Sequence, residues 1–180
     1  MDIPERQFPY KGKNIALVGM PGTFKSTIGK FLSKSLIDMS FCDTDILFEK
    51  IVGKTIKETF AEDGEEVFRQ KETEVLETAI KTPRQIIATG GGIVLQEKNR
   101  KLLKENCFVI ELTAEPESIY TRTRISGRRP LLKDATSKSI QDLYKIRGPL
   151  YGEIARMRIS TDYRHPRFIA REIMARLCDE

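Results

Sequence analysis

The chain has 180 residues, of which 39% are hydrophobic and 32% charged, and its formal net charge is +5. This length suits one domain with a full-sized core, and no run approaches the roughly 20 apolar residues needed to span a membrane. The absence of Trp and an aromatic content of 8% disfavour an RNA-binding platform of stacked aromatics. The positive charge allows nucleotides, phosphates, carboxylates or nucleic acid as partners.

Apolar patterning in the first half of the chain predicts alternating strands and helices. Residues 14–19 form an apolar run that ends in glycine, as a buried strand would, and apolar positions recur at helical spacing over 28–36. Thr55 and Glu58 form a capping-box pattern that opens a further helix. The other elements expected in this half are a short strand end at 41–45, a break at Gly64, a helical stripe over 67–80 that Pro83 ends, and a strand over 85–89.

The second half continues this alternation, apart from one segment. Residues 125–136 are rich in Arg, Lys, Gly and Ser and have few apolar anchors, which indicates a mobile flap. The elements expected around it are a strand over 107–112, a helix over 116–124, separate helices over 137–147 and 150–155, a strand over 157–161 and a helical tail from Pro166. This order predicts an α/β fold, a three-layer α/β/α sandwich around a mostly parallel sheet.

The cysteines give no sign of a metal site. Cys42, Cys107 and Cys178 lie far apart and the chain has one histidine, His165, so the sequence contains no zinc-binding pattern. Reduced thiols in a cytosolic protein are the simplest interpretation. Residues 1–13 contain no apolar stretch of signal-peptide length. We therefore expect a cytoplasmic protein without a membrane partner.

The stretch GMPGTFKST, residues 19–27, nearly matches a phosphate-binding loop, which requires Gly, four free residues, Gly, Lys and then Ser or Thr. Gly19, Lys25 and Ser26 fit, but Phe24 occupies the position of the second glycine. A strand before the loop and a helix after it are the context in which backbone N–H groups hold phosphate. Lys25 would neutralise the β- and γ-phosphates and Ser26 would bind Mg²⁺. A turn that holds Lys-Ser by chance is the other interpretation.

Asp43 and Asp45 form a second candidate site. On extended backbone, side chains two residues apart point to one face, so one carboxylate could hold a Mg²⁺-bound water while the other takes a proton from an attacking hydroxyl. Alternatively, Asp45 caps a helix that begins near Ile46. On these residues alone the capping interpretation is slightly favoured.

Three consecutive glycines and a set of arginines complete the candidates. Glycines directly after a buried strand let a ligand touch the backbone, at the edge where open α/β sheets bind ligands, although an ordinary turn is the alternative. Arginine grips carboxylate or phosphate with a two-pronged fork, but most surface arginines are only solvated. The residues concerned are Gly90, Gly91, Gly92, Arg69, Arg122, Arg128, Arg129, Arg147 and Arg164.

Taken together, these stretches resemble the shikimate kinase family over residues 14–177. They are LVGMPGTFKSTIG, DTD, FAEDGEEVFRQKE, ATGGGIV, RRPLL and RGPLY, in the family's order and at about its spacing. The resemblance implies the nucleoside-monophosphate-kinase-like P-loop NTPase fold with a five-stranded parallel sheet. It also implies ATP-dependent phosphorylation of the shikimate 3-hydroxyl, on the route to chorismate and the aromatic amino acids. One kinase domain would fill residues 1–180, with the phosphate loop at 19–27, a shikimate-binding region at about 43–80 and a lid at about 122–136.

The resemblance also implies roles by position. Lys25, Asp45 and Arg129 would be catalytic, with Asp45 as the base and Arg129 as the lid arginine that reaches the phosphates. Ser26 and Asp43 would hold Mg²⁺, the implied cofactor. The implied ATP-binding residues are Gly22, Thr23, Phe24, Lys25, Ser26, Thr27, Arg122, Arg129 and Arg164. The implied shikimate-binding residues are Asp45, Arg69, Gly90, Gly91, Gly92 and Arg147. ATP and shikimate are then the partners, without nucleic acid or membrane, and we expect a monomer.

Two other functions remain open on the sequence. One is a P-loop kinase of another small hydroxylated acid or sugar, such as gluconate, although Arg69, Gly91 and Arg147 favour a compact carboxylate. The other is a kinase-shaped binding or regulatory module without catalysis. Only Phe24 supports that module, since the other expected site residues are all present.

Phe24 also decides how well the loop works. If its φ is negative, the ring can turn away from the nucleotide at little cost. If the loop requires a positive φ, the β-carbon costs roughly 1–2 kcal/mol, which is about a tenfold loss in ATP affinity or more. We expect a working but compromised loop in which Phe24→Gly tightens ATP binding. An unchanged or weaker affinity would show a loop built around the phenylalanine.

Overall fold

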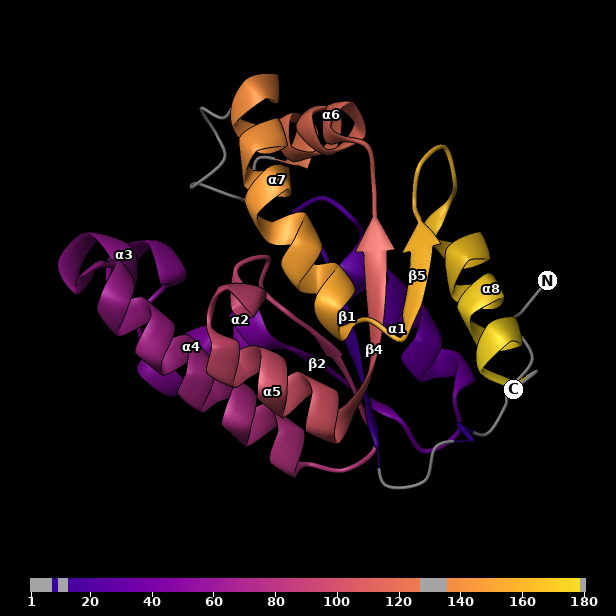
Figure 1. Ribbon diagram of the computed structural model, residues 1–180. Coiled ribbons are helices and arrows are strands. Elements are labelled where there is room, and N and C mark those ends of the chain that lie inside the picture. The colour runs from indigo at the N-terminus through magenta and orange to yellow at the C-terminus, as the bar shows by residue number, and fades with distance from the viewer. Residues whose placement is uncertain (1–7, 10–12, 127–135, 179–180) are drawn as a thin grey trace.

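The computed structural model describes residues 8–9, 13–126 and 136–178, and within them five strands form one sheet (Figure 1). The strand order is β2-β3-β1-β4-β5, and every neighbouring pair is parallel. The strands are β1 (Asn14–Val18), β2 (Ser40–Asp43), β3 (Gln85–Ala88), β4 (Cys107–Thr113) and β5 (Met157–Ser160). The expected five-stranded parallel sheet is thus confirmed.

Helices cover both faces of the sheet, which gives the expected three layers. In Figure 1, α1 and α8 lie on one face, while α5 and α7 lie on the other. The helices are α1 (Lys25–Ser35), α2 (Thr44–Val52), α3 (Ile56–Glu62), α4 (Gly64–Lys81), α5 (Glu97–Asn106), α6 (Pro116–Ser126), α7 (Ser137–Ile154) and α8 (Pro166–Cys178), with a short 3₁₀ helix η1 (Ile93–Leu95) before α5.

Alternate residues of β1 divide the core into two clusters. Ile15 and Leu17 pack with apolar residues of α1 and α8, whereas Ala16 and Val18 pack with those of α4, α5 and α7. All four side chains are fully buried. A parallel strand that is buried on both faces carries a continuous apolar run, which is why residues 14–19 predict this strand so clearly.

The strand order brings three sequence motifs to one edge of the sheet. Strands β2, β3 and β1 are neighbours, and a candidate motif lies at or just after the end of each: Asp43 with the first turn of α2, Gly90–Gly92, and the loop 19–27. Because the strands are parallel, their carboxyl ends meet at the same edge, where open α/β sheets bind ligands. The topology therefore assembles the three motifs into one candidate site.

The sequence predicts two separate helices over 137–147 and 150–155, and this division is wrong. Helix α7 continues from Ser137 to Ile154, with Pro149 inside it. Proline removes the one N–H that would bond to the carbonyl four residues earlier. Tyr151 and Ile154 remain buried beyond the proline, so packing against the sheet supports the helix on both sides of it.

Two further helices differ in how well the sequence predicts them. The capping box of α3 is confirmed, because Thr55 Oγ1 accepts from the Glu58 N–H at 3.1 Å and the Glu58 carboxylate accepts from the Thr55 N–H at 2.8 Å. No helix is expected at α5, where Leu102 and Leu103 are the large apolar residues in an otherwise polar segment. Across the described residues, no helix is long and apolar enough to cross a membrane.

Candidate active site

The loop between β1 and α1 contains two glycines with positive φ that pack closely against neighbouring elements. Gly19 has a φ of 141°, and a β-carbon there would collide with the carbonyl oxygen of Leu112 at the end of β4. Gly22 has a φ of 84°, and a β-carbon there would lie 3.3 Å from Cγ2 of Thr123 on α6. The loop is therefore fixed between β4 and α6.

Lys25 is the buried cation of this loop. Its Nζ donates to the carbonyl oxygens of Gly19 and Met20, each at 2.8 Å, and the residue is 4% exposed. The hydroxyl of Thr23, which is also buried, donates to the Met20 carbonyl at 2.8 Å. The first turn of α1 contains no acidic residue, so the positive end of its dipole is not offset. A lysine beside a helix N-terminus suits a phosphate.

Phe24 is the N-cap of α1 and adopts the left-handed conformation, with φ 62° and ψ 22°. The loop thus needs a positive φ at the position of the missing glycine, and the β-carbon brings the cost of roughly 1–2 kcal/mol. The ring is half-buried against the cluster that joins the sheet to α1 and α8. The Cζ of Arg122 lies 4.4 Å from the ring centroid. A cation–π contact of this kind is worth about 0.5–2 kcal/mol, which is as large as that cost.

A hydroxyl and a carboxylate meet between α1 and β2. The Ser26 hydroxyl donates to Oδ2 of Asp43 at 2.6 Å. These oxygen donors fit Mg²⁺, which in nucleotide sites takes one or two protein ligands together with phosphates and water. Among the described residues, no group of three or more His, Cys, Asp and Glu side chains could hold a metal. Ser26 and Asp43 would therefore hold an ion together with phosphate oxygens.

Asp45 is placed differently from both sequence interpretations. Strand β2 ends at Asp43 and α2 begins at Thr44, so Asp45 lies in the first helical turn and not on extended backbone beside Asp43. The capping interpretation is also wrong, because Asp43 is the cap and its Oδ1 accepts from the Asp45 N–H at 3.0 Å. A β-carbon on Gly90 would lie 2.9 Å from Oδ1 of Asp45, so this carboxylate faces the glycine turn.

Charged side chains from α4 approach the same glycine turn. A β-carbon on Gly90 would lie 3.1 Å from Oε1 of Glu72, and a β-carbon on Gly92 would collide with Nη1 of Arg69. The charged ends of both side chains therefore lie directly against the backbone of the glycine turn. The turn joins the carboxylates and the arginine into one polar site.

The Gly91 carbonyl is held by α7. It accepts from the Tyr151 hydroxyl at 2.5 Å and from Nη1 of Arg147 at 3.3 Å. The Nε of Arg147 is buried and has no hydrogen-bond partner among the described residues. A β-carbon on Gly91 would lie 2.8 Å from Cδ of Pro21, so the phosphate loop borders the same turn. A partly buried guanidinium whose buried Nε has no partner in the described part of the chain suits a ligand that carries a carboxylate or hydroxyl groups.

Glu72 and Tyr151 are site residues that the sequence analysis does not identify. Arg69 pairs with Glu72 at 2.8 Å and with Glu65 at 3.1 Å. Burial raises the pKa of the Glu72 carboxyl, Arg69 opposes this effect, and the negative charge of Asp45 adds to it. A signal for Glu72 exists, since it follows Arg69 by three residues and therefore shares its helical face. Tyr151 belongs to the RGPLY stretch, but nothing local indicates its distant partner.

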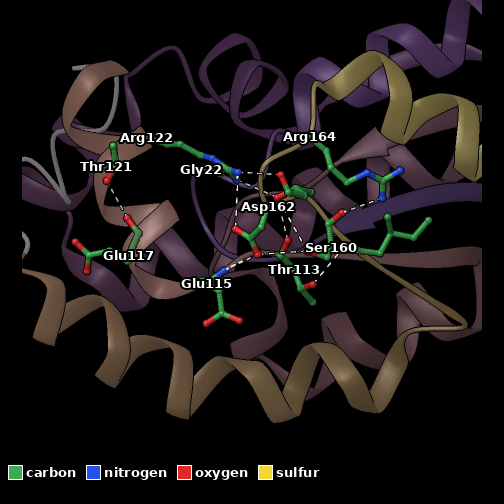
Figure 2. Close-up of polar contacts among 11 residues, drawn as sticks. Gly22, Thr113, Glu115, Glu117, Thr121, Arg122, Ser160, Asp162 and Arg164 are labelled. Carbon is green, nitrogen blue, oxygen red and sulfur yellow. Dashed lines mark hydrogen bonds and ion pairs between the residues drawn. The ribbon is translucent and has the colours of Figure 1, made fainter.

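Two of the arginines expected to bind ATP, Arg122 and Arg164, are placed differently from each other (Figure 2). Arg122 reaches from α6 toward the phosphate loop, and its guanidinium donates to the carbonyl oxygens of Gly22 at 3.3 Å and Thr161 at 2.8 Å. Burial lowers the pKa of Arg122. In Figure 2, Arg164 extends away from Arg122, and its Nη2 pairs with Glu172 of α8 at 2.5 Å. Arg122, unlike Arg164, thus contacts the loop.

Thr27 and the lid arginine complete the expected nucleotide contacts. Thr27 is exposed in the first turn of α1, next to Ser26. Arg128, Arg129 and residues 127–135 of the expected lid lie outside the described residues. The catalytic role of Arg129 therefore stays a prediction.

Comparison with known proteins identifies the family. The shikimate kinase family's sequence profile matches residues 21–178. The chain belongs to the shikimate kinase family. It is 43% identical over 167 residues to the shikimate kinase of Symbiobacterium thermophilum, a match that covers 91% of this chain and 95% of that one. The solved structure of shikimate kinase from Acinetobacter baumannii in complex with shikimate has a TM-score of 0.88 and 36% identity, over 94% of each chain.

Membership of the shikimate kinase family confirms the resemblance and the P-loop fold that it implies. A gluconokinase from Sinorhizobium meliloti is also similar in structure, with a TM-score of 0.61 over 97% of this chain and 94% of that one. Its identity is 16%, so that likeness extends to the fold alone. The shikimate kinase relationship therefore outweighs the gluconate alternative.

Proposed function

We propose that this chain transfers the γ-phosphoryl group of ATP to the 3-hydroxyl of shikimate. The observation that carries the proposal is the convergence of three motifs at one edge of the sheet. The phosphate loop follows β1, Asp45 follows β2, and the glycine turn after β3 lies beside Arg69 and Arg147. An ATP site and a small-carboxylate site therefore share one turn of backbone, and family membership supports shikimate as the acceptor.

Two guanidinium groups suit the carboxylate of shikimate. The side chain of Arg69 is 11% exposed and is oriented by its 2.8 Å ion pair with Glu72. Arg147 has a buried Nε without a partner among the described residues. A planar fork can donate two parallel N–H bonds to a carboxylate, which gives direction as well as charge. The region 43–80 and the last turns of α7 would thus bind the acceptor together.

Asp45 is suited to the role of general base. Its carboxylate faces the glycine turn, where Glu72 interacts electrostatically with Asp45 and with both arginines. We propose that it takes the proton of the 3-hydroxyl as that oxygen bonds to the γ-phosphorus. The bond between the γ-phosphorus and the bridging oxygen then breaks, so ADP leaves and the proton passes from Asp45 to solvent. Phosphoryl transfer needs mainly positioning and charge neutralisation, which Lys25 would supply at the phosphates.

The remaining expectations extend this proposal. Ser26 and Asp43 would hold Mg²⁺ beside the phosphates, and the ion would neutralise charge on the transferring group. A lid at about 122–136 would close over ATP and bring Arg129 to the phosphates, which keeps water from the reaction. We propose a monomer that acts in the cytoplasm on these small molecules, without nucleic acid or membrane.

A rate comparison tests the acceptor. ADP release is measured with MgATP and equal concentrations of shikimate, gluconate or other sugar acids. We expect shikimate to be used at least about 100-fold faster than gluconate, because a polar site discriminates strongly against ligands that leave its buried groups unpaired. Turnover of gluconate without turnover of shikimate would overturn the proposed acceptor. Binding of MgATP and shikimate by calorimetry, without turnover, would instead favour a non-catalytic module.

A further inference from the structure

Phe24 and Arg122 form a stack where the phosphate loop meets α1. The guanidinium carbon lies 4.4 Å from the centroid of the Phe24 ring. The same guanidinium donates to the Gly22 carbonyl at 3.3 Å, so Arg122 contacts the loop through both the Phe24 ring and the backbone. Phe24 adopts a left-handed conformation that a phenylalanine rarely takes. A contact that fixes the ring therefore also stabilises the turn.

Arg122 is itself firmly placed. Its Nη1 and Nη2 donate to the hydroxyl and the carbonyl of Thr161 at 2.9 and 2.8 Å, and Asp162 lies 3.8 Å from Nη2. Its neighbour Thr123 packs against Gly22. The arginine thus joins α6 and the β5–α8 connection to the phosphate loop. The Phe24 ring covers a guanidinium that has fixed partners, not a mobile surface charge.

We propose that Phe24 is a positioning residue for nucleotide binding, which holds the phosphate loop in its left-handed turn by stacking on Arg122. The inference rests on the proposed function, since it assumes that this loop binds ATP. Glycine in this position would supply the same backbone conformation without the stack. In this chain the stack on Arg122 stabilises the positive φ that glycine would adopt without strain, so the loop is built around Phe24.

This inference reverses the expectation from the sequence. Phe24→Gly removes the strain of the β-carbon but leaves Arg122 in contact with the loop only through the Gly22 carbonyl, so it should weaken MgATP binding and not tighten it. Phe24→Leu keeps an apolar side chain but lacks a π face, and should weaken binding about three- to tenfold, within the range of a single cation–π contact. Phe24→Trp keeps a ring that binds cations well and should restore most of the affinity.

Calorimetry with MgATP tests the stack through a double-mutant cycle. The variants are Phe24→Leu, Arg122→Met and the pair, with Phe24→Gly and Phe24→Trp beside them. We expect the double variant to bind MgATP no more weakly than Arg122→Met alone, because the ring has then lost its partner. Phe31→Leu is the matched control, since Phe31 packs against the same apolar cluster from the same helix. It should change MgATP affinity less than twofold.

Several outcomes would overturn the inference. Phe24→Gly could bind MgATP more tightly than wild type, or the effects of Phe24→Leu and Arg122→Met could multiply. The chain has no natural Trp, so the emission of Phe24→Trp reports on the loop directly and checks that this variant is folded. A change in its emission on adding MgATP is expected, and no change would contradict the placement of the ring. If wild type bound MgATP but did not phosphorylate shikimate, the proposed function would be refuted and this inference would not. The double-mutant cycle measures MgATP binding without shikimate.

Discussion

The hydroxyl of Ser26 donates a 2.6 Å hydrogen bond to the carboxylate of Asp43, which joins the first turn of α1 to the end of β2. Both groups carry oxygen atoms of the kind that Mg²⁺ prefers as ligands. Asp43 is also fixed by the Asp45 N–H, so the carboxylate is oriented before any ion binds. The pair therefore gives the proposed magnesium site a defined geometry.

Loss of either group should weaken the response to magnesium. We expect Ser26→Ala and Asp43→Asn to lower the apparent Mg²⁺ affinity or the activity about 10- to 100-fold, as changes around metal ligands do. The measurement is the initial rate as a function of free Mg²⁺ at saturating ATP and shikimate. Ser33→Ala is the control, because that hydroxyl lies on the same helix and bonds to the Lys30 carbonyl, away from the site. If Ser26→Ala and wild type gave the same Mg²⁺ curve, the site would be wrongly placed.

Arg69→Lys should act on shikimate and not on ATP. Lysine keeps the charge but loses the fork that matches a carboxylate, and bonds to charged groups are worth about 1.5–3 kcal/mol. We therefore expect the KM for shikimate to rise about 10- to 100-fold, with the KM for MgATP within twofold of wild type. The exposed Arg171→Lys on α8 serves as the control. Equal changes in both KM values would point to a general loosening of the fold.

Asp45→Asn should remove the base while keeping the shape of the site. General base catalysis contributes roughly 10²–10⁴-fold, so kcat should fall by about that factor. Calorimetry should show that shikimate still binds, since the amide can hydrogen-bond to hydroxyls. A kcat within about tenfold of wild type would contradict the assignment of the base.

Glu72→Gln tests the electrostatics of the site through the pH dependence of stability. Burial raises the pKa of Glu72 above its ordinary value, so the folded chain holds this proton more tightly than the unfolded chain. The stabilisation from this group is therefore complete below the unfolded pKa and is lost as the pH rises through the folded pKa. The glutamine variant lacks that loss. Its free energy of unfolding, relative to wild type, should increase in urea titrations as the pH rises above about 4.5, the ordinary pKa of this carboxyl.

The matching control lies on the same helix. The exposed Glu74→Gln should leave the difference from wild type nearly constant over the same pH range. A Glu72→Gln variant whose relative stability falls with rising pH would show that the ion pair with Arg69 outweighs burial. The pKa of the Glu72 carboxyl would then be lowered in the folded chain, not raised.

Local pattern was sufficient to predict the parts of the fold that depend on local physics. The apolar run before Gly19 and the glycines after β3 mark the ends of buried parallel strands, and both predictions are confirmed. Thr55 caps α3 as its pattern predicts. Pro149 misleads, because the helix around it is stabilised by packing that only the folded chain possesses.

The contacts within the site depended more on tertiary structure. Asp45 could not be placed without knowing that α2 begins at Thr44. The Tyr151 hydroxyl reaches Gly91, 60 residues away in the chain, and no local pattern indicates such a partner. Arg122 and Arg164 look equivalent in the sequence, yet one guanidinium contacts the phosphate loop and the other pairs with Glu172. The partner of a long side chain depends on which groups lie near it in the folded chain.

The most direct test of the central claim is the identity of the product. Wild-type chain is incubated with MgATP and shikimate, and the reaction is followed by phosphorus NMR with mass spectrometry of the acceptor. The account predicts equal amounts of ADP and shikimate 3-phosphate, at a rate well above ATP hydrolysis without acceptor. ADP formation that shikimate does not accelerate, with inorganic phosphate as the only new phosphorus species besides ADP, would contradict it.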